Sequence, residues 1–101
     1  MRITDAQVER VRALVAAIPP GRVTTYGDIA SAARISTPRT VGWIMRTDAA
    51  DLPWHRVIGQ SGRPAAHLAY RHLELHAADG VPVVDGRVPL TDSVRHDFGT
   101  D

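Results

Sequence analysis

Apolar residues recur at helical spacing near the start of the chain. They lie three or four positions apart, as on one face of an amphipathic helix: Val8, Val11, Leu14, Val15 and Ile18. Thr4, followed three residues later by Gln7, has the form of a capping box, which marks the beginning of such a helix. The run Pro19-Pro20-Gly21 cannot continue it. The pattern therefore predicts an amphipathic core helix that ends before residue 19.

Two shorter helices are predicted next, over residues 28–33 and 39–46. Thr25 with Asp28 repeats the capping-box pattern, with Asp in the third position. A turn is expected at residues 34–36. Thr37 followed by Pro38 is then a strong signal for a helix start, because proline fits the first helical position. Two short helices joined by a tight turn are typical of a helix-turn-helix, although the pattern alone also fits two ordinary core helices.

The second half of the chain predicts fewer regular elements. Residues 60–64 have the Gly, Ser and Pro content of a loop, and a helix is expected over residues 68–78 with Gly80 as its C-cap. Asp-Gly at positions 85 and 86, between β-branched residues, predicts a short hairpin. The end is polar and acidic. We therefore expect a domain over residues 1–90 and a flexible acidic tail over residues 91–101.

The composition fits one small globular domain. The chain has 101 residues, of which 44% are hydrophobic, enough for a single modest core. No apolar run approaches the ~20 residues of a membrane span, and the first residues lack the apolar stretch of a secretory signal. We therefore expect a cytoplasmic protein that does not bind membranes. The absence of Cys excludes disulfides, thiolate metal sites and thiol nucleophiles within this sequence.

The charges are unevenly distributed, although the net charge is only +1. Residues 20–72 carry seven Arg and three acids, a net +4, whereas residues 73–101 carry six acids and two Arg, a net −4. A basic middle indicates one face suited to a polyanion. All 12 basic residues are Arg, which favours bidentate phosphate contacts and stacking on bases; a codon bias toward Arg explains the missing Lys equally well.

Residues 53–56, which read Pro-Trp-His-Arg, form the most compact group of chemically versatile side chains. On its own, this group is better explained as an indole in the core with His and Arg as its polar cover. His67, His72 and His76 raise the question of a metal site, because the last two lie four residues apart on the expected helix. No pattern of a further ligand accompanies them, so we expect neither a metal nor another cofactor.

Three stretches in order carry a family resemblance. Residues 18–30 read Ile-Pro-Pro-Gly-Arg-Val-Thr-Thr-Tyr-Gly-Asp-Ile-Ala, residues 38–45 read Pro-Arg-Thr-Val-Gly-Trp-Ile-Met, and residues 53–59 read Pro-Trp-His-Arg-Val-Ile-Gly. Over about residues 4–90 the chain resembles the DNA-binding domain of the O6-alkylguanine-DNA alkyltransferases. In that family the third stretch reads Pro-Cys-His-Arg-Val, and its Cys accepts the alkyl group. Trp54 stands at that position here, as in the alkyltransferase-like proteins.

The resemblance implies a fold and a set of contacts with a flipped base. The fold is mainly α: a small single domain with a helix-turn-helix (winged-helix-like) DNA-binding core and a short C-terminal β-hairpin. Arg39 matches the arginine finger that fills the gap left by the base, and Tyr26 matches the Tyr that presses on the neighbouring phosphate. Trp54 is expected to form a pocket wall, since an indole stacks but offers no nucleophile. The helix beginning at Pro38 corresponds to a recognition helix that lies in the minor groove.

Other matched positions border or support the expected pocket. Six are expected beside the DNA or the lesion: Thr25, Gly27, Pro38, Ser61, Gly62 and Arg63. Thr25 is expected near a phosphate, at a helix start. The loop that holds the last three is slightly short compared with the family's. Structural support is expected from His55, hydrogen-bonded to Asp79, and from Arg56, which braces the turn.

The resemblance implies a DNA damage sensor for DNA repair, acting by nucleotide flipping and not an enzyme. We expect a monomer that binds double-stranded DNA containing O6-alkylguanine and flags it for nucleotide excision repair, whose damage-recognition protein is an expected partner. Without Cys, dealkylation of this type has no nucleophile. The alternatives are a helix-turn-helix transcription regulator that binds undamaged DNA, and an enzyme acting through His55, such as a glycosylase, which needs a carboxylate or activated water nearby.

Overall fold

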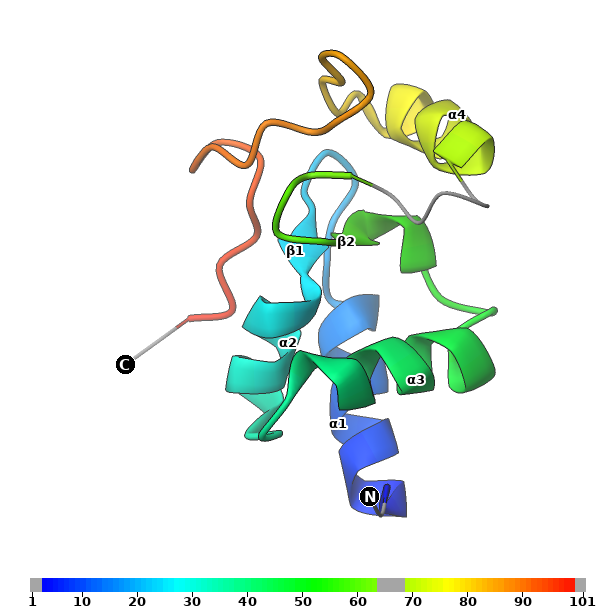
Figure 1. Ribbon diagram of the computed structural model, residues 1–101, viewed down its shortest axis with the longest axis vertical. Helices are drawn as coiled ribbons and strands as arrows, with labels where there is room; N and C mark the ends of the chain where they lie inside the picture. The colour runs from blue at the N-terminus through cyan, green and yellow to red at the C-terminus, as the bar shows by residue number, and fades with distance from the viewer. Residues whose placement is uncertain (1–2, 64–68, 100–101) are drawn as a thin grey trace.

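The computed structural model describes residues 3–63 and 69–99. The elements follow the order α1 (Asp5–Ala16), β1 (Thr24–Thr25), α2 (Tyr26–Ala33), α3 (Pro38–Asp48), the 3₁₀ helix η1 (Trp54–Arg56), β2 (Val57–Ile58) and α4 (Ala69–Asp79) (Figure 1). The predicted class, a small mainly α domain with a helix-turn-helix core, is confirmed. In this described part of the chain, no helix has the length and apolar character that crossing a membrane requires.

Side-chain caps begin each of the first three helices, as the sequence predicts. Thr4 forms a complete capping box at α1. Thr25 Oγ1 accepts the Asp28 backbone N–H at the start of α2 (3.0 Å). Thr37 caps α3, where Pro38 is the first helical residue. Each cap satisfies a backbone donor that the helix itself leaves unpaired, so the three starting points are set locally.

The helix-turn-helix consists of α2 and α3, and α1 packs against both. After α2 the chain turns at Arg34, whose left-handed backbone (φ 59°) ends the helix, and Ile35 then enters the core. Figure 1 shows α3 crossing α1 with α2 beside them. The apolar faces of the three helices form one cluster of buried side chains: Val11, Val15, Ile18, Ile29, Ala30, Ala33, Ile35, Val41, Ile44 and Val57.

A two-stranded parallel sheet joins the two halves of the chain. Thr24 pairs with Val57 and Thr25 with Ile58. The sequence did not predict this pairing, because two residues on each side are too few to show an alternating pattern. The pairing joins the segment immediately before α2 to the segment immediately after η1, so it brings together the first (residues 18–30) and third (residues 53–59) of the three stretches that carry the family resemblance.

The predicted hairpin is present as a single antiparallel pair. Val84 and Arg87 exchange two backbone hydrogen bonds, of 2.8 and 3.1 Å. Asp85 (φ 52°) and Gly86 (φ 76°) both have positive φ, as a two-residue hairpin turn of this kind requires. The hairpin leads to Val88, which packs in a second buried cluster with Val23 just before β1, Ile58 of β2, Val81 just after α4, and Val94 of the C-terminal segment.

Residues 91–99 pack against the domain, whereas a flexible tail is expected over residues 91–101; residues 100 and 101 lie outside the described residues. Val94 is buried, and Val23 makes two backbone hydrogen bonds to the segment (2.9 and 2.7 Å). The Arg95 guanidinium donates two hydrogen bonds to the Asp28 carboxylate (2.7 and 2.8 Å). The acidic composition of the segment indicated that it would be solvated. Buried Val94 and the ion pair of Arg95 are nevertheless enough to hold it against the start of β1 and α2.

Candidate nucleic-acid interface

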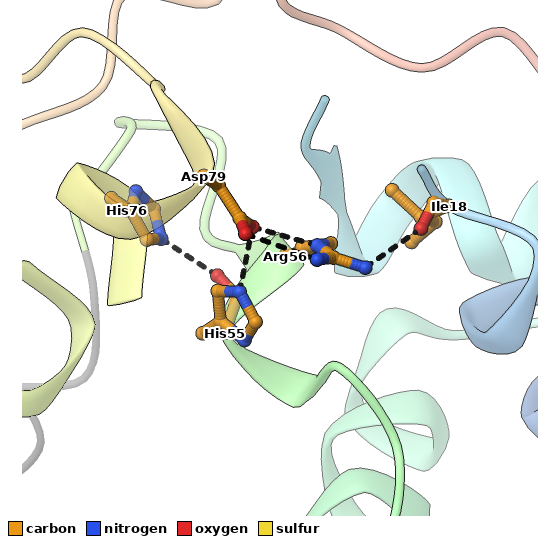
Figure 2. A network of polar contacts seen from close by, with 5 residues as sticks. All are labelled: Ile18, His55, Arg56, His76 and Asp79. Atoms are coloured by element: carbon orange, nitrogen blue, oxygen red, sulfur yellow. Dashed lines mark hydrogen bonds and ion pairs between the residues drawn. The ribbon is translucent and has the colours of Figure 1, made fainter. Parts of the chain in front are cut away.

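The turn that carries Trp54 is held by a polar network of residues from three parts of the chain: the segment after α1, η1 itself and α4 (Figure 2). Arg56 Nε and Nη2 donate to the two carboxylate oxygens of Asp79 (2.7 and 3.1 Å), and Nη1 donates to the Ile18 carbonyl (3.1 Å). His55 Nε2 lies 2.8 Å from Asp79 Oδ2. The hydrogen bond predicted between His55 and Asp79 is therefore present, and Arg56 braces the turn as expected.

Asp79 is the centre of this network. Its side chain is only 12% exposed, and it is the acceptor for both Arg56 and His55. The hydrogen bonds from Arg56, helped by those from His55, lower its pKa from 3.8 to about 2, against the opposing effect of burial. The carboxylate therefore stays ionised. It anchors the end of α4 to η1, and Trp54, the first residue of η1, is positioned by this attachment.

Two histidines of α4 pack behind Trp54. The His72 ring lies 5.1 Å from the indole, and His76 Nε2 donates to the His55 carbonyl (2.7 Å). Burial, and then the neighbouring His76, lower the pKa of His72 to about 4, and burial lowers that of His76. His72 is therefore neutral at pH 7 and lies beside the indole as an aromatic neighbour, whereas the His76 ring packs against those of His55 and His72. Over residues 3–63 and 69–99, no three or more His, Cys, Asp or Glu side chains are grouped as metal ligands; His67 lies outside that range.

Tyr26 is the first residue of α2, immediately after the cap Thr25. It is partly buried, and this burial raises its pKa, while the positive charge of Arg46 acts in the opposite direction. Thr25 is fully buried, and its hydroxyl is engaged by the helix backbone. The predicted contact of Thr25 with phosphate therefore has no exposed side-chain atom to make it. A Cβ on Gly27 would lie at ordinary contact distance from Gln60 Nε2 (3.6 Å), so this glycine is not sterically required.

Arg39 is exposed in the first turn of α3, after Pro38. The same helix exposes Trp43, which keeps 52% of its surface accessible, and Arg46, whose guanidinium lies 5.8 Å from the centre of the Trp43 ring. Sequence reasoning missed Trp43 and Arg46. Their spacing of four and seven residues from Arg39 places all three on one side of a helix, and this signal could have identified them.

The loop predicted to border the pocket is built around Gly62. Its φ is +79°, and a Cβ there would lie 2.2 Å from the Val88 carbonyl oxygen. Gly62 N–H donates to the Gly59 carbonyl (2.9 Å), and its own carbonyl accepts Val88 N–H (2.8 Å). Gly62 is buried and holds the loop against Val88, just after the hairpin, so its expected place at the border of the pocket stays a prediction. Ser61 and Arg63 on either side are exposed.

Comparison with known proteins adds a family match. The family model described as the DNA binding domain of 6-O-methylguanine DNA methyltransferase matches residues 6–81. A protein of Escherichia coli (strain K12) named DNA base-flipping protein is 43% identical over 65 residues, which are 61% of this chain and 50% of that protein. A Shigella flexneri protein of the same name matches equally. The chain thus spans about half the length of the curated relatives it matches.

Several solved structures share the fold. The S. pombe Atl1 chain, crystallised with damaged DNA containing O6-carboxymethylguanine, superposes with a TM-score of 0.80 at 28% identity, covering 93% of this chain and 97% of that one. A second structure, S. pombe ATL in complex with DNA, gives a TM-score of 0.73 at 31% identity, covering 90% and 93%. The O6-methylguanine methyltransferase of Mycobacterium tuberculosis gives 0.60 at 31% identity, covering 89% of this chain and 54% of that one.

Proposed function

Because the chain belongs to the family of 6-O-methylguanine DNA methyltransferase DNA-binding domains, we propose that it binds duplex DNA and recognises O6-alkylated guanine without removing the alkyl group. The observation that carries the proposal is the position of Trp54. It is the first residue of η1, and the hydrogen bonds of His55 and Arg56 to Asp79 fix this turn. By the resemblance of residues 53–57, this is where the alkyltransferases have their reactive Cys.

The residues at this turn can bind but have no means of accepting an alkyl group. Alkyl transfer of this type needs a thiolate, and the sequence contains no Cys. An indole has one N–H donor and no nucleophilic atom of comparable strength. His55 is hydrogen-bonded to Asp79 through Nε2, so the carboxylate that a His-dependent enzyme needs is present, but the sequence offers no thiol for this pair to activate. Recognition is the function that these groups support.

Base extrusion is the recognition step we assign, because the O6 edge of guanine is hidden in the duplex. Turning a base out costs a few kcal/mol, and less where alkylation has already weakened pairing with cytosine. Stacking on an aromatic face contributes about 1–3 kcal/mol per base, so the indole of Trp54 can offset that cost. Arg39 is free on the surface of α3 to enter the stack, and Tyr26 at the start of α2 borders the extruded nucleotide.

Binding along the minor groove by α3 suits this task. That groove distinguishes A·T from G·C pairs but reads little else, so a helix there contributes little sequence preference. A sensor of damage must work in any sequence. We place this activity in the domain of residues 1–90, acting as a monomer in the cytoplasm, and assign removal of the damage to nucleotide excision repair through its damage-recognition protein.

The direct test is a titration by fluorescence anisotropy of two duplexes that differ only in one O6-methylguanine. We expect the alkylated duplex to bind at least about tenfold more tightly, which is 1.4 kcal/mol of preference. Arg39→Ala should remove most of that preference. Arg87→Ala is the matched control, because it removes the same charge from the exposed hairpin. Equal affinity of the wild type for both duplexes would favour the alternative, a transcription regulator of undamaged DNA.

The absence of catalysis needs a separate measurement. Alkylated duplex is incubated with excess protein, and both are then analysed by mass spectrometry. We expect the unchanged protein mass and full recovery of O6-methylguanine after nuclease digestion. A methyl group on the protein, or loss of the modified base from DNA, would instead establish an enzyme.

A further inference from the structure

Trp43 is unusually exposed for so large an aromatic residue. It keeps 52% of its surface accessible on α3, whereas Val41 and Ile44 of the same helix are completely buried. These two residues fix the rotation of the helix, because they pack in the cluster formed with α1 and α2. Burying the indole would require α3 to rotate, which would remove Val41 and Ile44 from the core. Single exposed aromatic residues are common on protein surfaces, so the meaning of this one depends on the side chains beside it.

The neighbours of Trp43 make this surface basic. Arg39 lies one turn before it on the helix, and the Arg46 guanidinium lies over its ring at 5.8 Å, within the range of a cation–π contact. No acidic residue occurs between positions 34 and 47. Arg39, Trp43 and Arg46 therefore form one face of α3.

We propose that Trp43 and Arg46 form a second DNA contact, independent of the lesion, in which the indole packs against deoxyribose in the groove and the guanidinium binds a phosphate. This deepens the proposed function, and rests on it for the assignment of α3 to DNA. The occupant is duplex DNA because the face combines two Arg with an aromatic plane and lacks carboxylates. Arg contacts phosphate, and a flat indole packs on sugars and base edges.

The spacing along α3 predicts where the contact falls. Four residues of helix advance about 6 Å, which corresponds to roughly two base-pair steps of DNA. If Arg39 occupies the gap at the lesion, Trp43 reaches the backbone about two nucleotides away, where the duplex remains paired. Its contribution is then the same whether or not the guanine is alkylated. Arg39 governs discrimination between the two duplexes, whereas Trp43 and Arg46 govern affinity for both.

The test measures dissociation constants of Trp43→Gln, Trp43→Phe and Arg46→Gln for matched duplexes with and without O6-methylguanine. Trp43→Gln should weaken binding to both by about tenfold and leave their ratio unchanged, while Trp43→Phe should retain most of the affinity. Arg46→Gln should also lower the slope of log affinity against log salt by about one, as expected for one lost phosphate contact. Val84→Thr, which changes an exposed apolar residue on the hairpin, serves as the control and should bind normally.

A spectroscopic readout distinguishes contact from an indirect effect on folding. The sequence has two Trp, so in a Trp54→Phe background Trp43 is the remaining indole. Its fluorescence should change on saturation with undamaged duplex. Wild-type affinity of Trp43→Gln for both duplexes, or a loss confined to the alkylated one, would overturn the inference. If the wild type shows no preference for alkylated DNA but Trp43→Gln weakens binding to both duplexes, the damage-sensor proposal fails and the second contact stands.

Discussion

Replacing Asp79 with Asn tests the network that positions Trp54. The variant keeps the size of the side chain but removes the charge that accepts two hydrogen bonds from Arg56 and one from His55. A pKa held at about 2 instead of 3.8 corresponds to about 2 kcal/mol of stabilisation by the folded environment. Asp79 and Arg56 are only 12% and 14% exposed, so the unpaired guanidinium adds to the loss. We expect Asp79→Asn to lower the free energy of unfolding by about 2–4 kcal/mol.

The assay is urea denaturation at pH 7, followed by far-UV circular dichroism and Trp fluorescence. Asp85→Asn is the matched control, because this exposed turn residue has a positive φ that Asn accepts readily, and its stability should stay within about 0.5 kcal/mol of wild type. The difference between wild type and Asp79→Asn should shrink as pH falls from about 4 toward 2, since the native carboxylate is then protonated. If Asp79→Asn is as stable as the control at pH 7, the network does not hold the turn.

Two further substitutions test the elements around this turn. Gly62→Ala should lower the free energy of unfolding by more than about 2 kcal/mol in the same urea assay, because its Cβ would lie 2.2 Å from the Val88 carbonyl oxygen. The control Gly80→Ala has a similar φ but open space around the Cβ, and should lose about 1 kcal/mol. Equal losses in the two variants would refute the steric argument. Folding lowers the pKa of His72 from 6.5 to about 4. Between these two pH values, His72 is protonated in the unfolded chain but neutral in the folded protein. The wild type should therefore have its full free energy of unfolding above pH 6.5 and lose up to about 3 kcal/mol of it as the pH falls toward 4. The loss should be smaller in His72→Leu. If His72→Leu loses as much stability over this range as the wild type, the assignment is wrong.

The parts of the fold that depend on local sequence were predictable. Helix starts follow from the side chain of one residue and its near neighbours, and Thr4, Thr25 and Thr37 all cap as expected. The bond between His55 and Asp79 was also anticipated, but only through the family resemblance, since the two residues lie on different elements.

The remaining features depend on contacts between distant parts of the chain. The parallel pairing of β1 with β2 involves two residues on each side, too few for a periodic pattern. Gly62 reads as an ordinary loop glycine until Val88 is brought against it. Trp43 has the hydrophobicity of a core residue; its spacing from Arg39 places the two on one side of α3, and the burial of Val41 and Ile44 shows that this side faces outward. Val94 holds a segment whose acidic composition predicted a free tail.

The central claim is that Trp54 holds an extruded alkylated guanine that the protein cannot repair. The position of that base in crystals of the complex with an O6-methylguanine duplex tests it most directly. We predict the modified base turned out of the helix beside the indole of Trp54, its methyl group intact, with the Arg39 guanidinium in the vacated space. A guanine that remains stacked and paired within the duplex would contradict the account.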